Sequence, residues 1–184
     1  MSRYTGKKNR IARRFGVNIF GRKRNPLLHK PNPPGMHGAR RRKKSDYGLQ
    51  LEEKQKLKAV YGMITEKQLV NTYKKALRKG GNTAQILAEM LECRLEVVVY
   101  RLKFGNTIFA AQQLVSHGHI LVDGKKVDIR SYYVRPGQVI SIKENSRQMT
   151  SIHDAMNNPM HNVPEYVEAD HTQFSGKLLA SPTI

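Results

Sequence analysis

Hydrophobic residues recur at helical spacing through the middle of the chain. Leu57, Val60, Tyr61 and Ile64 repeat at i, i+3, i+4 and i+7, which is typical of one buried face of a helix. Two more such patterns follow before residue 93. Their inward positions are Leu69, Tyr73, Ala76 and Leu77, and then Ile86, Leu87, Met90 and Leu91. Three short amphipathic helices over residues 45–93 predict a small helical bundle.

Polar and flexible residues mark where these helices begin and end. Ser45 is a suitable N-cap for the first helix and Thr65 for the second. Gly80 and Gly81 are expected to end the second helix, and Thr83 to start the third.

The pattern changes from helix to strand between Arg94 and Glu144. Two helical stripes come first, with Leu95, Val98, Val99 and Leu102 inward in one and Ile108, Ala111, Leu114 and Val115 inward in the other. Alternating residues then lead into Asp123-Gly124, a strong two-residue hairpin signal, and VISIK at 139–143 reads as a strand. Residues 94–145 are therefore predicted to form two helices packed on a small antiparallel sheet.

The two ends of the chain lack this regularity. Prolines and glycines between residues 25 and 38 exclude a long helix and predict an extended loop, preceded by a short basic helix at 9–15. Residues 146–184 are mixed, with a short helix expected at 151–156 and edge strands at 166–168 and 177–179. The fold class is thus α+β, in four parts: an arm at 1–44, a helical domain at 45–93, the module at 94–145, and a C-terminal segment at 146–184 that packs back on the helical domain.

Charge changes the interpretation of the arm. The chain has 33 Lys and Arg against 14 acidic residues, a formal net charge of +19, and none of the acids lies in residues 1–44. Such an excess indicates a polyanionic partner, either nucleic acid or an anionic membrane surface. No run of about 18 apolar residues or secretory signal is present, so we expect no membrane. A basic arm can be solvated and disordered, but its interspersed hydrophobic residues favour ordering on a polyanion.

The residues offer little for catalysis. No nucleophile-elbow, phosphate-loop or dinucleotide motif occurs. Cys93 lies between apolar neighbours and is interpreted as a buried structural thiol. His117 and His119 are compatible with a metal pair, but without a third ligand nearby the simpler interpretation is hydrogen bonding to backbone or phosphate. We therefore predict no enzyme, cofactor, metal or small-molecule substrate.

Basic and polar side chains gather in the module, which has few acids. The two helices could be taken for a DNA-reading helix-turn-helix, but a third helix and a base-reading face are missing. Structured RNA, recognised by shape and phosphate placement, fits better. The Arg40–Lys44 run is also compatible with a nuclear localisation signal, which nothing else supports.

Longer motifs make the pattern specific. RLEVVVYRLKFGNTIFAAQQLVSHGHILVDGKKV resembles the RNA-binding domain named after the small-subunit ribosomal S4 family, and RYTGKKNRIARRFG and PPGMHGARRRKKSDYGLQLEEKQKLKAVYG resemble that family's opening and central signatures. The resemblance covers almost everything up to about residue 150. Family members often have zinc-binding cysteines in the arm, and this chain has none there.

This resemblance implies a cytoplasmic protein of the ribosome. It implies early binding to a multi-helix junction in the five-prime domain of small-subunit ribosomal RNA, a role in translational accuracy, and the third and fifth small-subunit proteins as neighbours. Arg40 and Lys43 fall where family members face incoming messenger RNA. The alternatives are a free RNA-binding chaperone and an RNA-modification accessory protein carrying the same domain.

Charge pattern and resemblance together give the candidate RNA-binding residues. They are Arg3, Tyr4, Lys8, Arg10, Arg13, Arg14, Arg22, Arg24, His37, Arg40, Arg41, Arg42, Lys43, Lys44, Ser45, Tyr47, Arg94, Tyr100, Arg101, Gln112, Gln113, Ser116, His117, His119, Lys125 and Lys126.

Overall fold

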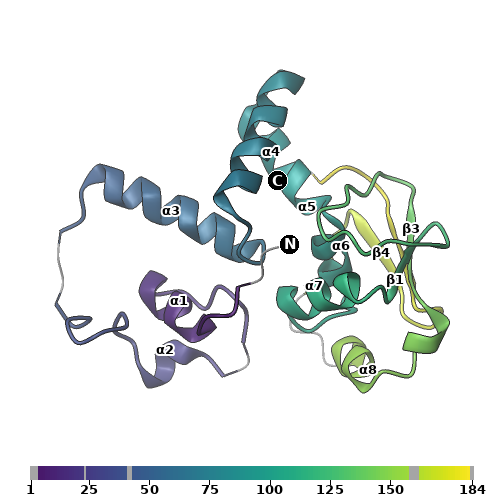
Figure 1. The fold of residues 1–184 in the computed structure, drawn as a ribbon, viewed down its shortest axis with the longest axis horizontal. Coiled ribbons are helices and arrows are strands. Elements are labelled where there is room, and N and C mark those ends of the chain that lie inside the picture. Colours follow the sequence, from purple (N-terminus) through teal and green to yellow (C-terminus); the bar gives the residue numbers. More distant parts are fainter. Residues whose placement is uncertain (1–3, 23, 41–42, 158–161, 183–184) are drawn as a thin grey trace. The chain divides into compact units, whose positions relative to one another are not determined.

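The protein has helices and an antiparallel sheet, as an α+β fold requires (Figure 1). The computed structural model describes residues 4–22, 24–40, 43–157 and 162–182. The chain divides into two compact units, and the boundary in the sequence falls between Leu69 and Val70. This division falls inside a helix rather than at a predicted boundary, so the four-part organisation stays a prediction.

The first unit begins with two short helices that lie beside each other, α1 (Lys8–Phe15) and α2 (Pro26–His29). Helix α1 confirms the predicted basic helix. Helix α2 was not predicted, because we expected only an extended loop there. A local cap explains it: Asn25 Oδ1 accepts a hydrogen bond from Leu27 N at 3.0 Å, and a proline at the first helical position needs no donor partner.

Helices α3 (Asp46–Val60) and α4 (Glu66–Lys79) follow, and their predicted caps are confirmed. Ser45 Oγ accepts from Gly48 N at 3.2 Å. Thr65 forms a reciprocal capping box with Gln68, in which each backbone N–H donates to the other residue's side chain, at 3.3 and 3.1 Å. Lys54 and Lys58 both donate to Glu66, at 2.8 Å each, and join the end of α3 to the start of α4.

The predicted inward face of these helices is only partly correct. Tyr61, Ile64, Leu69 and Ala76 are buried, as is Ala59. However, other predicted inward residues are 36–50% exposed, and these are Leu57, Val60, Tyr73 and Leu77. A bundle of three helices with its own core therefore stays a prediction.

The second unit contains the main hydrophobic core. Helices α5 (Thr83–Glu92), α6 (Leu95–Arg101) and α7 (Ile108–Ser116) supply one side of it. Asn82 caps α5 and Thr107 caps α7 through their side-chain oxygens. Cys93 is fully buried in this core, which confirms the structural thiol.

The sheet supplies the other side. It consists of β1 (Ile120–Val122), β2 (Lys125–Lys126), β3 (Val139–Ile142), β4 (Val167–Asp170) and β5 (Ser175–Leu178), all antiparallel, in the order β2-β1-β3-β5-β4. Asp123 and Gly124, both at positive φ (48° and 77°), make the predicted hairpin turn between β1 and β2. Helices α6 and α7 lie together on one side of this sheet, so the predicted module is confirmed (Figure 1).

The C-terminal segment completes the sheet, while its packing on the helical domain stays a prediction. It begins with a short 3₁₀ helix (Glu144–Ser146) and α8 (Thr150–Asn157), which confirms the predicted short helix. Strand β5 then pairs with β3 and lies inside the sheet, so the prediction of two edge strands holds only for β4. A Cβ on Gly176 would overlap the Leu102 side chain, so glycine lets β5 cross the end of α6 closely.

Candidate nucleic-acid interface

Exposed polar side chains occur both near the end of α7 and on the β1–β2 hairpin. Gln113, Ser116 and His117 are exposed near the end of α7, and Lys125 and Lys126 are exposed on β2. We call these five residues the hairpin face. Gly118, at φ 73°, connects its two halves: a Cβ there would overlap the Lys126 side chain, so that chain crosses the end of α7 closely.

The one acid in the hairpin is engaged within the fold. Asp123 accepts hydrogen bonds from Val139 N at 2.9 Å and from Gln138 Nε2 at 2.7 Å. These bonds lower the pKa of Asp123, the backbone bond most of all, and hold the carboxylate toward β3. Within the described part of the chain, no ion pair includes Lys125 or Lys126. The hairpin face is therefore positive and available to an anion.

His119 is half-buried at the margin of this face. Its Nδ1 lies 2.8 Å from Ser146 Oγ, and its ring centroid is 6.0 Å from that of His117. Burial lowers the pKa of His119, and the neighbouring His117 and Lys143 lower it further. Among the residues that the structure describes, no group of three or more His, Cys, Asp or Glu is placed to hold a metal ion.

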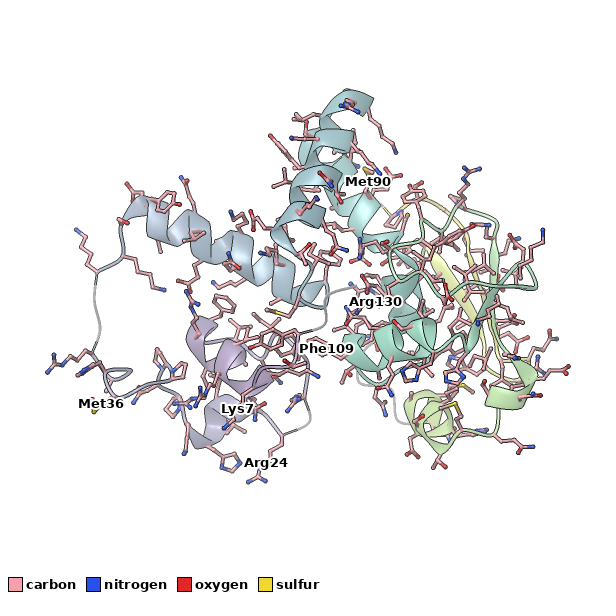
Figure 2. The ribbon with its side chains drawn as sticks, in the orientation of Figure 1. Lys7, Arg24, Met36, Met90, Phe109 and Arg130 are labelled. Atoms are coloured by element: carbon pink, nitrogen blue, oxygen red, sulfur yellow. The ribbon has the colours of Figure 1, made fainter. Side chains whose placement is uncertain are left out.

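Two of the predicted contacts on α6 and α7 belong to a buried cluster. Arg94, only 8% exposed, donates from Nε and Nη2 to Glu96 Oε1 at 2.8 and 2.5 Å. Burial raises the pKa of Glu96, while Arg94 acts in the opposite direction. Gln112 is 8% exposed, and Arg130, labelled in Figure 2, accepts from Glu96 N through its carbonyl at 3.2 Å. Arg94 and Gln112 thus lie inside the fold and not on the hairpin face.

A third predicted contact, Arg101, forms a network with Glu92 and Tyr166. Arg101 donates to both carboxylate oxygens of Glu92, at 3.1 and 2.8 Å, and Tyr166 OH donates to the same carboxylate at 2.8 Å. The Glu92 side chain is 4% exposed. The network connects α5, α6 and the C-terminal segment. Tyr100 beside it is half-buried, and burial raises its pKa.

Three arginines of the arm surround a cavity in the first unit. The cavity measures about 380 Å³ and is lined by Asn9, Arg13, Arg22, Arg24, Pro26, His29 and Lys30. Arg24 lies on the segment that leads into α2 (Figure 2). Sequence reasoning placed the three arginines in an RNA-binding arm but did not bring them together.

The other predicted residues of the arm are mostly exposed. Tyr4 and Lys8 are half-buried, whereas Arg10, Arg14, His37, Arg40, Lys43, Lys44 and Tyr47 are exposed. Lys44 forms an ion pair with Glu52, and Ser45 serves as the cap of α3. Arg3, Arg41 and Arg42 lie outside the described residues.

Sequence reasoning missed some exposed cations and cavity residues. Exposed cations on α4 are Lys67, Lys74, Lys75 and Arg78. Their helical spacing was visible, but only the inward residues of this helix were considered. Asn9, His29 and Lys30 line the cavity, and nothing in their local pattern indicated that.

A basic, acid-poor hairpin beside two helices on an antiparallel sheet defines a nucleic-acid-binding type of α+β protein. The family described as "Ribosomal protein S4/S9 N-terminal domain" matches residues 3–92, and the "S4 domain" matches residues 93–140. The chain therefore belongs to the S4 family of small-subunit ribosomal proteins.

Curated relatives support this assignment over the whole chain. The small ribosomal subunit protein uS4 of Protochlamydia amoebophila is 75% identical over 182 residues, which cover 99% of this chain and 88% of the relative. The uS4 proteins of Chlamydia muridarum and Chlamydia pneumoniae are 63% and 61% identical, with 100% and 99% of this chain covered and 88% of each relative.

Family membership assigns the chain to the small ribosomal subunit as a structural protein rather than an enzyme. In bacteria the ribosome lies in the cytoplasm. Among the residues of this chain that the structure describes, no helix is long and apolar enough to span a membrane.

Proposed function

We propose that this protein is a structural constituent of the small ribosomal subunit that binds ribosomal RNA directly. The hairpin face carries this proposal: two exposed lysines lie on β2, three exposed polar side chains lie near the end of α7, and the Lys126 side chain crosses that helix end. The acid of the hairpin turn, Asp123, is bonded within the fold. Phosphate contacts of this kind position a protein on RNA without reading its sequence. The S4 domain match supports the same role.

The family resemblance supports a finer proposal. The RNA target is the multi-helix junction of the five-prime domain, where the protein nucleates assembly of the subunit. The exposed Arg40 and Lys43 face messenger RNA at the entry region, which contributes to translational accuracy, and the third and fifth small-subunit proteins are neighbours. Two alternatives, a free RNA chaperone and an RNA-modification accessory protein, use the same domain without staying in the subunit.

Fractionation of ribosomes distinguishes these alternatives. The protein should sediment with the small subunit on sucrose gradients and stay there after a high-salt wash. A protein found mainly in the free fractions would contradict the proposal in favour of the chaperone or accessory role.

A single-charge comparison tests the hairpin face. Lys126→Gln should weaken binding to the five-prime domain RNA and reduce the magnitude of the slope of log K against log salt by about 0.7–0.9, because one phosphate contact is lost. Lys177→Gln on β5 removes the same charge from an exposed position outside the face. Filter binding at several salt concentrations measures both. Equal slopes for the two variants would show that the hairpin face is misplaced.

A further inference from the structure

The cavity of the arm has a fixed lining, because every residue that lines it takes part in a hydrogen bond. Arg13, on α1, donates from Nε to the carbonyls of Lys30 and Asn32, both at 3.0 Å, and from Nη2 to that of Pro33 at 3.4 Å. This guanidinium fastens α1 to the segment after α2. The cavity between them is therefore a consequence of folding in the first unit.

Two further arginines are oriented by neutral partners. Arg22 Nη1 donates to Asn9 Oδ1 at 2.9 Å, and Arg24 Nε donates to His29 Nε2 at 3.1 Å. An amide oxygen and an imidazole nitrogen fix the direction of each guanidinium but do not neutralise it. A guanidinium has five N–H donors, and each of these bonds uses one.

The charge of the cavity has no anionic counterpart nearby in the sequence, because residues 1–44 contain no Asp or Glu. The arginines that line it repel one another, and an anion would relieve that repulsion. Arginine forks match the oxygens of a phosphate, to which they donate two parallel hydrogen bonds.

We infer that this cavity receives a phosphate group of the RNA backbone, with Arg22 and Arg24 as its ligands. Arg13 is a positioning residue that holds the cavity open. The volume of about 380 Å³ lies within the range of small-ligand sites and accommodates a phosphate with its attached sugar. This inference rests on the proposed RNA-binding function and adds a discrete phosphate site to it.

Substitutions in the full-length protein test the site. Arg22→Gln and Arg24→Gln should each weaken binding to the five-prime domain RNA about tenfold or more, since a hydrogen-bonded charged contact is lost. Lys7→Gln removes one charge from an exposed position of the same arm, beside the cavity residues in sequence but outside its lining, and should change affinity by less than about threefold. Arg22→Lys keeps the charge but not the fork, and should restore only part of the affinity.

Ethylation interference locates the phosphate itself. When individual phosphates of the RNA are ethylated, modification of one particular phosphate should block binding of the wild-type protein. This interference should disappear with Arg22→Gln, while interference at the other phosphates persists. An unchanged interference pattern would overturn the inference. If titration calorimetry shows that the cavity binds inorganic phosphate while the ethylation interference pattern is the same in wild type and Arg22→Gln, the cavity is a site for a free anion and the inference is wrong.

Failure of the inference is distinguishable from failure of the proposed function. If Arg22→Gln and Arg24→Gln bind the RNA as tightly as the wild type and Lys7→Gln do, only the cavity assignment is wrong. If none of the four proteins binds it, the proposed function is wrong. Circular dichroism of each variant should show retained helix content, and Arg22→Lys provides a second comparison if Arg22→Gln does not fold.

Discussion

At the scale of single residues, the Glu92 carboxylate accepts three hydrogen bonds in the second unit. It accepts both donors of the Arg101 fork and the hydroxyl of Tyr166, although its side chain is 4% exposed. Burial raises the pKa of Tyr166, and the adjacent Glu92 raises it further, so the hydroxyl stays a donor. Glu92 therefore joins the C-terminal segment to α6.

Glu92→Gln should destabilise the protein by about 2–4 kcal/mol, because the Arg101 charge would lose its partner in a largely buried position. Tyr166→Phe removes one hydrogen bond and should cost only about 1 kcal/mol. Urea unfolding at neutral pH measures both values. Glu165→Gln is the control, since it removes the same charge from an exposed residue next to Tyr166 in the sequence. A Glu92→Gln variant as stable as this control would contradict the role of the network.

The two arginines of α6 show where sequence reasoning reaches its limit. Their charge and the family resemblance suggested that Arg94 and Arg101 bind RNA. Arg94 instead binds Glu96, two residues further along the chain, and Arg101 binds Glu92. The second pair forms only because α5 packs against α6. Spacing within one helix carries no information on that packing.

At the scale of elements, local signals predicted more than tertiary ones. Caps at Ser45 and Thr65 and the turn at Asp123-Gly124 act over a few residues, and all three are confirmed. Leu57 and Tyr73 were assigned to a buried face and are exposed. Periodicity identifies an apolar stripe, but it does not identify the element that covers it.

The junction of α3 and α4 gives a prediction that depends on pH. Hydrogen bonds from Lys54 and Lys58 lower the pKa of Glu66 to about 2. A carboxylate with a lowered folded pKa contributes stability above its unfolded pKa, and loses that contribution as pH falls toward the folded value. Part of the stability of the first unit should therefore disappear between about pH 5 and pH 2.

Glu66→Gln should remove this part of the pH dependence while lowering the melting temperature slightly at neutral pH, because exposed ion pairs contribute little. Thermal unfolding followed by circular dichroism from pH 2 to 7 measures the effect. Glu53→Gln is the control, because Glu53 is exposed and its ion pair, with Lys56, lies within α3. Identical pH profiles for wild type and Glu66→Gln would rule out the assigned pairing.

At the scale of the whole molecule, charge is distributed very unevenly. The arm of residues 1–44 carries 15 of the 33 cations and no acid, which leaves a net charge of only +4 for the other 140 residues. The hairpin face identifies the type of RNA-binding domain, while the arm supplies most of the positive charge. This imbalance was fully readable from the sequence, whereas the cavity in the arm depended on the fold of α1 and α2.

Self-repulsion from this charge predicts opposite effects of salt on stability and on binding. Raising the salt concentration from about 0.05 to 0.5 M shortens the Debye length from more than 10 Å to less than 8 Å, which screens repulsion among the cations. The melting temperature of the protein without RNA should therefore rise with salt, while RNA affinity falls steeply.

Differential scanning calorimetry and filter binding on the same samples measure both trends. Phosphate or sulfate at matched ionic strength should stabilise the protein more than chloride if the arm holds polyvalent anions. The size of that extra stabilisation should fall in Arg22→Gln but not in Lys7→Gln, since only the former lines the cavity. A melting temperature that decreases with added chloride would mean that the ion pairs at Glu66 and Glu52 outweigh the repulsion among the cations of the arm.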